Sequence, residues 1–150
     1  MTTKINKVFL DTSVVFAAIL SPTGGARKLF QLGEARVLTL FIGQSVIREC
    51  EEVVRRKAPA SLPTLAHLLM IGRVETVRTP TKRMVEIARS VVGYEPDAYV
   101  LAEAIGAQPD WFVTHDKEHF LKEKKDSDLG FYIGTPGDLI QAMHDDFSQK

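Results

Sequence analysis

The sequence predicts an α/β fold in which helices cover both faces of a central, mainly parallel sheet, in a three-layer α/β/α arrangement. Short runs of β-branched and aromatic residues alternate with longer segments of helical periodicity, which is typical of βα units. The strand runs are apolar at nearly every position, as expected for strands buried on both faces. The chain has 150 residues, 45% of them hydrophobic and 25% charged. This is enough for a single domain over residues 1–150 with a substantial core.

The strands are predicted from short apolar runs that are rich in Val, Ile, Leu and Phe. The four clearest runs are residues 7–10, 37–42, 111–114 and 131–133. Residues 74–77 form a weaker candidate, either as a strand or as an extended connection.

The helices are predicted from apolar periodicity together with residues that end helices. They are residues 26–32, closed by Gly33; 45–57, ending before Pro59; 62–71, closed by Gly72; 82–92, closed by Gly93; and 96–105, closed by Gly106. A final helix begins after Thr135, with Pro136 in its first turn and Asp138 near its positive end.

The composition excludes several classes of protein. Nineteen basic and nineteen acidic residues cancel, so the chain does not hold nucleic acid by bulk charge alone. Cys50 is the only cysteine, which excludes an internal disulfide framework and a cysteine-rich zinc module and predicts a small core residue. The longest apolar runs are far shorter than the roughly 20 residues that span a bilayer, and MTTKINK lacks a secretory apolar region. We therefore expect a cytoplasmic protein.

Two aspartates stand where predicted strands end. In VFLDTSVV the strand ends at Asp11, and in DWFVTHDKE it ends just before Asp116. Parallel α/β sheets bind ligands outside the carboxyl ends of their strands, so both residues are candidates for a site. Either aspartate alone is equally well explained as a turn former or a helix cap.

A third acid is predicted on the helix over residues 45–57. Its apolar residues repeat at helical spacing and form one buried stripe. At about 100° per residue, Glu52 points away from this stripe, while Glu49 and Glu51 lie on its two flanks. The periodicity does not choose between Glu49 and Glu51 as the residue that overhangs a cleft.

Asp97 follows Pro96 in the first turn of a predicted helix, where the helix dipole alone would stabilise it. If Asp11, Glu49, Asp97 and Asp116 converge, their hard oxygen donors suit Mg²⁺ or Mn²⁺ rather than zinc or copper. Such an ion activates water and stabilises charge on a phosphoryl oxygen, which predicts phosphodiester hydrolysis.

Four motifs together resemble a PIN domain and occur in that family's usual order. They are LDTSV, the helical Glu49 upstream of EVVRR, EPDAYVLAEAI and WFVTHDKEHF, and the resemblance extends from Val8 to the GTPGDLI segment. It implies a metal-dependent nuclease in which Asp11, Glu49, Asp97 and Asp116 are the acids that bind the metal.

The resemblance also assigns supporting residues. Thr114 matches the family's supporting hydroxyl, and Thr12 or Ser13 is expected to orient ligands or water. His115 stands where the family more often has a small residue, commonly glycine, and so narrows the expected cleft. Arg27, Lys28 and Lys117 are candidates for phosphate contacts, although surface solvation explains each of them equally well.

Small PIN proteins of this length resemble VapC-like toxins, which implies endonucleolytic cleavage of RNA, an antitoxin partner and homodimerisation. The alternatives are a housekeeping RNA-processing nuclease and a non-catalytic RNA-binding or interaction module. Retention of all four acids favours an enzyme. A haloacid-dehalogenase-like phosphatase is disfavoured, because it would need a second Asp where Ser13 stands. A zinc site made of His115 and His119 is also disfavoured, because the two residues would straddle Asp116 at a strand end.

Overall fold

The computed structural model describes residues 4–116, 120 and 129–148. Its strands all run parallel and form one sheet in the order β3-β2-β1-β4-β5. They are β1 (Lys7–Leu10), β2 (Thr39–Ile42), β3 (Glu75–Thr76), β4 (Trp111–Val113) and β5 (Tyr132–Gly134). The predicted α/β architecture is therefore confirmed, and the weak strand candidate over residues 74–77 is a short edge strand.

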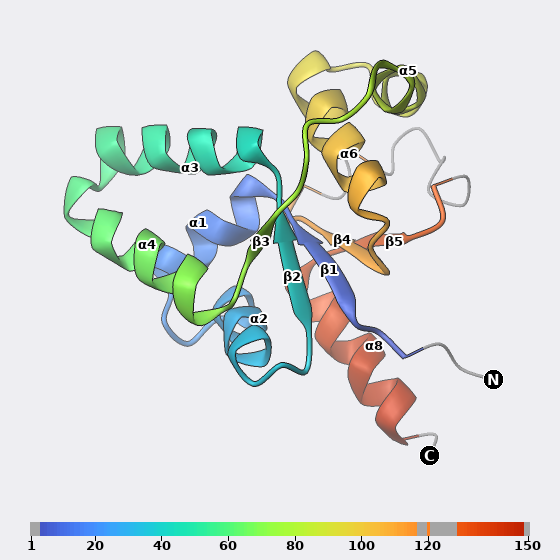
Figure 1. Ribbon diagram of the computed structural model, residues 1–150. Helices are drawn as coiled ribbons and strands as arrows, with labels where there is room; N and C mark the ends of the chain where they lie inside the picture. Colours follow the sequence, from blue (N-terminus) through green and yellow to red (C-terminus); the bar gives the residue numbers. More distant parts are fainter. Residues whose placement is uncertain (1–3, 117–119, 121–128, 149–150) are drawn as a thin grey trace.

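Helices form the two outer layers of the α/β/α arrangement (Figure 1). They are α1 (Thr12–Leu20), α2 (Gly25–Glu34), α3 (Gln44–Lys57), the short 3₁₀ helix η1 (Pro59–Ser61), α4 (Leu62–Ile71), α5 (Lys82–Val91), α6 (Glu95–Ala107) and α8 (Pro136–Ser148). Helices α1, α2 and α8 lie on one side of the sheet, and α6, with α5 packed along it, lies on the other. Helices α3 and α4 form a hairpin that projects beyond the sheet, and we call this hairpin the α3–α4 arm.

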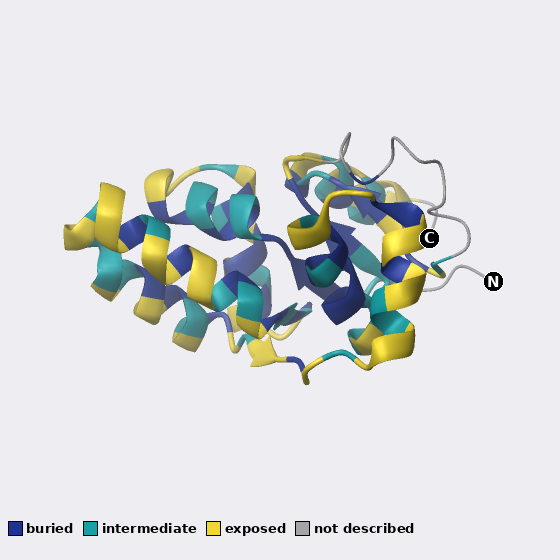
Figure 2. Ribbon diagram, turned by 90° about the horizontal axis from the view of Figure 1, so that it is seen from above, coloured by how far each residue is buried: buried dark blue, intermediate teal, exposed yellow. Residues whose placement is uncertain are grey.

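The core lies between the sheet and the helices that cover it. Phe9 and Phe112 are fully buried on neighbouring strands, and their rings stack with centroids 5.5 Å apart. Figure 2 shows buried residues concentrated in the sheet, whereas the α3–α4 arm carries many exposed positions on its outer side. Cys50 is fully buried, and burial raises the pKa of its thiol to about 12, so it is the inert core residue that the sequence predicts.

The strand register brings the chemically important residues to one edge of the sheet. Leu10 pairs with Val113, so the next residues, Asp11 and Thr114, emerge side by side from neighbouring strands. The backbone N–H of Asp11 extends this pairing by donating to the carbonyl oxygen of Val113 over 3.0 Å. In a parallel sheet these carboxyl ends face the same crevice.

The helix α1 was not among the predicted elements. Its sequence, TSVVFAAIL, is apolar on most of its surface, and Val14, Val15, Ala18 and Ile19 are all buried. Its less buried positions Phe16, Ala17 and Leu20 are apolar too, so the helix lacks the one-sided pattern by which amphipathic helices are predicted. It also starts directly after β1, with no glycine or proline between the two.

Two predicted helix ends were wrong because glycine does not act as a cap there. Gly33 lies inside α2, where an added Cβ would be 2.5 Å from the carbonyl oxygen of Gly72. Gly106 lies inside α6, which ends instead at Gln108 in the left-handed conformation with φ of 51°. Glycine at position 33 therefore permits close packing of α2 against the end of α4.

The remaining differences from prediction are small shifts at element ends. Strand β2 begins at Thr39 rather than at residue 37, where Val37 is 42% exposed. Helix α5 ends at Val91, and β4 and β5 shift by one residue at their ends. Within the described part of the chain, no helix is long and apolar enough to cross a membrane.

Candidate active site

Asp11 occupies the junction between β1 and α1. Its side chain is only 8% exposed. Its carboxylate accepts a hydrogen bond from the hydroxyl of Thr114 (Oγ1 to Oδ2, 2.7 Å) and a longer one from Ser13 (Oγ to Oδ2, 3.3 Å). The sheet register therefore fixes Asp11 between two hydroxyl groups at the carboxyl ends of the strands.

The same two hydroxyl groups hold the chain that follows β4. The fully buried Thr114 accepts a hydrogen bond from the backbone N–H of Asp116 over 2.9 Å. Ser13 accepts one from the backbone N–H of His115 over 3.0 Å. The hydroxyl groups that contact Asp11 therefore also hold the backbone of residues 115 and 116. Asp116 is exposed to solvent. Thr114 thus contacts both Asp11 and the backbone of Asp116, and its supporting role stays a prediction.

Glu49 reaches the site from the second turn of α3. Its carboxylate accepts a hydrogen bond from the hydroxyl of Thr12, the residue after Asp11 (Oγ1 to Oε2, 3.1 Å). Glu49 is exposed, as are Glu51 and Glu52, and Glu52 pairs with Arg56 over 3.5 Å on the outer surface of the arm. The hydrogen bond from Thr12 orients Glu49 toward the β1–α1 junction.

Asp97 lies half-buried in the first turn of α6. Its relation to the site appears in the electrostatics of Asp11, whose pKa is raised from 3.8 to about 6. Burial is the main cause, hydrogen bonds from Thr114 and from the backbone of Thr12 oppose it, and the negative charges of Asp116 and Asp97 add to it. The charges of two of the other acids, Asp97 and Asp116, therefore act on Asp11.

The donor atoms of this site suit a hard divalent cation. Carboxylate and hydroxyl oxygens surround Asp11, and these are the ligands that Mg²⁺ and Mn²⁺ prefer. As placed in the described residues, no group of three or more His, Cys, Asp or Glu side chains could hold a metal ion. The chemistry of the donor set thus fits such an ion, and the repulsion at Asp11 is what a cation would relieve.

The sequence interpretation missed Glu103. This residue lies in the middle of α6, is only 2% exposed, and faces the beginning of α3. Its Oε2 accepts a hydrogen bond from the backbone N–H of Ser45 over 3.2 Å, and its Oε1 accepts one from the hydroxyl of Ser45. The available signal was an acid inside the apolar run AYVLAEAI, where a charged residue needs a buried partner.

Some candidate phosphate contacts are structural. Arg27 donates from Nε and Nη2 to the carbonyl oxygen of Ala18, over 2.8 and 2.5 Å, and so ties α2 to α1. A guanidinium has five N–H donors, so these bonds leave the phosphate contact of Arg27 a prediction. Lys28 is exposed, whereas Lys117 and His119 lie outside the described residues.

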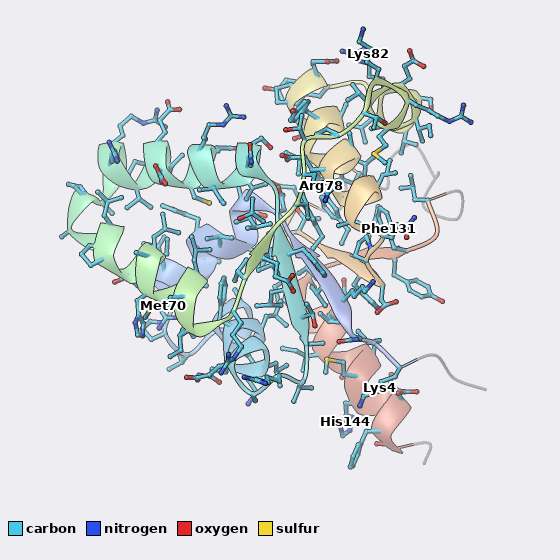
Figure 3. All side chains as sticks on the ribbon, in the orientation of Figure 1. Lys4, Met70, Arg78, Lys82, Phe131 and His144 are labelled. Atoms are coloured by element: carbon cyan, nitrogen blue, oxygen red, sulfur yellow. The ribbon has the colours of Figure 1, made fainter. Side chains whose placement is uncertain are left out.

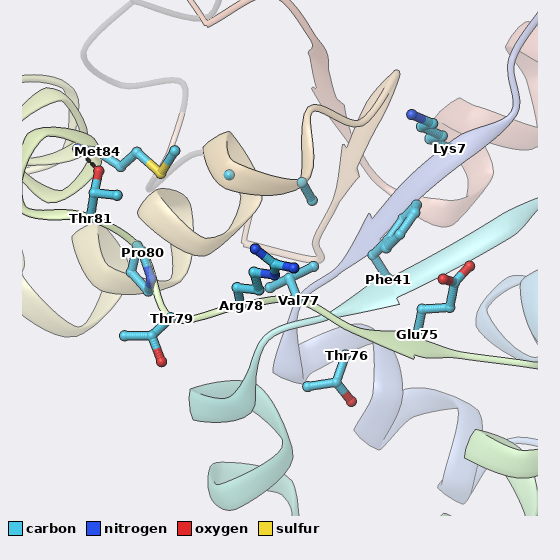
Figure 4. A pocket seen from close by; sticks show the side chains of 12 residues that line it. Lys7, Phe41, Glu75, Thr76, Val77, Arg78, Thr79, Pro80, Thr81 and Met84 are labelled. Atoms are coloured by element: carbon cyan, nitrogen blue, oxygen red, sulfur yellow. Dashed lines mark hydrogen bonds between the residues drawn. The ribbon is translucent and has the colours of Figure 1, made fainter.

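The described residues also form a groove with a volume of about 500 Å³ (Figure 4). Its wall is formed by Phe41 and Glu75 of the sheet, by the segment from β3 to α5, and by the last turn of α6. Arg78 lies in this segment, alongside α6 (Figures 3 and 4). None of the four predicted acids lines this groove.

Comparison with known families assigns the chain on the basis of most of its length. The family model described as PIN domain matches residues 7–118. The chain belongs to the PIN domain family. The match runs from β1 through the loop that carries Asp116, and therefore includes all four acids. No curated protein matches the chain. PIN domains are generally nucleases, so the family supports a hydrolase that acts on nucleic acid.

Proposed function

We propose that this PIN domain is a divalent-metal-dependent endoribonuclease, with Asp11, Glu49, Asp97 and Asp116 as the acids of its active site. The observation that carries the proposal is the environment of Asp11. Its carboxylate is buried at the strand ends, held by two hydroxyl groups, and raised in pKa to about 6 by burial and by neighbouring acids. Perturbed carboxylates that share a crevice are typical of functional sites.

The four carboxylates are the groups that would hold Mg²⁺ or Mn²⁺. Such an ion supplies an activated water molecule and stabilises the charge that develops on the phosphoryl oxygen. Nucleases of this type cleave phosphodiester bonds by hydrolysis, which yields two shorter strands. The resemblance to VapC-like ribonucleases is the reason that RNA is the proposed substrate.

The residues of the chain position these acids. Thr114 donates to Asp11 and accepts from the backbone of Asp116, so one hydroxyl group fixes the spacing of two acids. Thr12 in turn orients Glu49. At about pH 7, above its pKa of about 6, Asp11 is mostly ionised and available as a ligand. Below pH 6 a proton occupies this carboxylate, and cleavage should fall.

A direct assay tests the nuclease proposal. The purified protein should cleave RNA in the presence of Mg²⁺ or Mn²⁺ and should stop when EDTA is added. Activity that survives complete chelation would overturn the metal-dependent mechanism. Stable RNA binding without cleavage, with either ion, would instead favour a non-catalytic RNA-binding module.

The biological role that we propose is that of a VapC-like toxin, cytoplasmic and homodimeric, that is neutralised by a cognate antitoxin. Its support is the resemblance of the four motifs to PIN domains, together with a length that fits VapC-like toxins. A housekeeping RNA-processing nuclease is the alternative within the same chemistry. An antitoxin-like reading frame directly upstream, whose product copurifies with this protein and blocks cleavage, would distinguish the toxin from the processing enzyme.

A further inference from the structure

The N-terminus of α3 lacks a cap from its own sequence. Its N-cap residue is Gly43, which has no side chain to accept hydrogen bonds from the first turn. The first N–H groups of a helix have no partners within the helix and need acceptors from elsewhere. For Ser45, this acceptor comes from another helix, since its N–H donates to Glu103 of α6.

Glu103 is built into this position. Its carboxylate is almost completely buried and receives both the backbone N–H and the hydroxyl of Ser45. A buried carboxylate is costly unless hydrogen bonds satisfy it, and the positive end of a helix stabilises its charge. The contact therefore joins α6 to α3, and it gives hydrogen-bond partners both to the carboxylate of Glu103 and to the N–H of Ser45.

Gly43 makes room for this carboxylate. A Cβ added at position 43 would overlap the carboxyl group of Glu103. The backbone of Gly43 has φ of −82°, which any residue adopts, so the requirement for glycine here is steric. Gly43 and Glu103 therefore form a matched pair.

The pair lies where the two helices that carry Glu49 and Asp97 meet. Glu49 lies one helical turn beyond Ser45 on α3, and Asp97 lies within two turns of Glu103 on α6. Because α3 continues into the projecting arm, a small rotation at its N-terminus would displace Glu49 (Figure 1). We propose that Glu103 is a positioning residue that holds α3 against α6 and so sets the separation of Glu49 from Asp97. This inference rests on the proposed function insofar as Glu49 and Asp97 bind the metal.

The first experiment tests the helix contact without any metal. Spin labels are attached at Arg55→Cys on α3 and Lys82→Cys on α5, which packs along α6; both positions are exposed, and Cys50 is buried. The distance distribution between the labels should broaden or shift in Glu103→Ala. It should stay as in the parent in Glu103→Gln, which keeps an acceptor for Ser45. An unchanged distribution in Glu103→Ala would overturn the proposal.

The second experiment measures Mn²⁺ affinity by calorimetry. Loss of a group that orients a metal ligand costs about 10- to 100-fold in affinity, so Glu103→Ala should bind Mn²⁺ at least about tenfold more weakly. Glu103→Gln should keep most of the wild-type affinity for Mn²⁺. If Glu103→Ala fails to fold, Gly43→Ala, which retains the carboxylate but displaces it, should weaken binding in the same direction.

A matched control separates positioning from stability. Thr135→Ala removes the acceptor for the N–H of Asp138 at the start of α8, a helix that carries none of the four acids. It should lower Tm and leave Mn²⁺ affinity unchanged. Glu103→Ala that lowers Tm but keeps wild-type Mn²⁺ affinity would make Glu103 purely structural and overturn the proposal. A wild type that binds no Mn²⁺ would overturn the proposed function instead, and the label distances would still decide whether Glu103 holds the two helices together.

Discussion

The two halves of the acid site are held in different ways. Asp11 and Asp116 come from strand ends, where sheet register and the hydroxyl groups of Ser13 and Thr114 fix them. Glu49 is carried by a helix of the projecting arm and is exposed. Its orientation depends on a hydrogen bond from Thr12 and on how α3 packs. We call the sheet half of the site the rigid half, because strand pairing and hydroxyl hydrogen bonds hold it. The helical half depends on contacts between elements.

We expect the largest effect when a substitution removes one acid from either half of the site. Asp11→Asn and Glu49→Gln should each reduce RNA cleavage by about 10²-fold or more, because each removes a carboxylate that would hold the metal ion. Glu51→Gln and Glu52→Gln should stay within a few-fold of wild type in the same gel-based cleavage assay. If Glu51→Gln is the inactive variant and Glu49→Gln is not, the assignment of the helical acid is wrong.

A second prediction concerns stability in the rigid half without metal. The pKa of Asp11 is raised in the folded protein from 3.8 to about 6, so the folded state binds its proton more tightly than the unfolded chain does. Stability from this group is therefore full below about pH 4 and is lost as pH rises to about 6, by about 3 kcal/mol. Urea unfolding in EDTA across this range should show the decline.

Asp11→Asn is the control for this pH dependence. The variant has no carboxyl group at position 11 and should lose most of the decline between pH 4 and 6. In EDTA near pH 7 it should melt no lower than wild type, because it also removes repulsion with Asp97 and Asp116. An equally steep decline in the variant would mean that other groups cause it.

A third prediction concerns the stability that the protein gains when a cation binds to both halves of the site. Mg²⁺ or Mn²⁺ should raise the Tm of the wild type, by about 2.7 kcal/mol of stability at a hundredfold excess over Kd. Asp11→Asn should lose most of this gain. Thermal melts of both proteins with and without the ion measure it, and equal shifts in the two would rule out a shared site.

The smallest expected effect concerns the hydroxyl group of Thr114. Thr114→Val keeps the shape of the fully buried side chain but removes the donor to Asp11 and the acceptor for the N–H of Asp116. Leaving such groups without partners should cost about 1–3 kcal/mol in urea unfolding and raise the pKa of Asp11 further. Thr114→Ser should retain both bonds and most of the stability. Equal losses in the two variants would point to packing of the Thr114 methyl group.

Much of the fold could be predicted because its information is local. Continuous apolar runs identified the strands, and the strand ends at Asp11 and residue 114 identified one edge of the sheet. Helix α1 was not predicted because a helix that is apolar on its exposed side as well as on its buried side resembles a buried strand in sequence. Gly33 was misread because a glycine that permits close packing looks the same as one that ends a helix.

For the candidate site, sequence proposed the acids but not what holds them. Thr114 lies two residues from Asp116, so its role could be anticipated from the motif. Ser45 and Glu103, however, are separated by 58 residues, and only the folded chain shows that they meet. Periodicity left Glu49 and Glu51 equivalent, because the hydrogen bond from Thr12 is a tertiary contact.

The Gly43–Glu103 pair also constrains the order in which this chain can evolve. While Glu103 is present, any side chain at position 43 would overlap its carboxylate. While Gly43 is present, loss of Glu103 creates no steric overlap, although it removes the hydrogen bonds to Ser45 that hold α3 against α6. The accessible mutational path therefore replaces Glu103 first, and the glycine becomes free to vary only afterwards. Among descendants of this sequence, a larger residue at position 43 should accompany a shorter residue at position 103, and a larger residue at position 43 together with Glu103 should be rare.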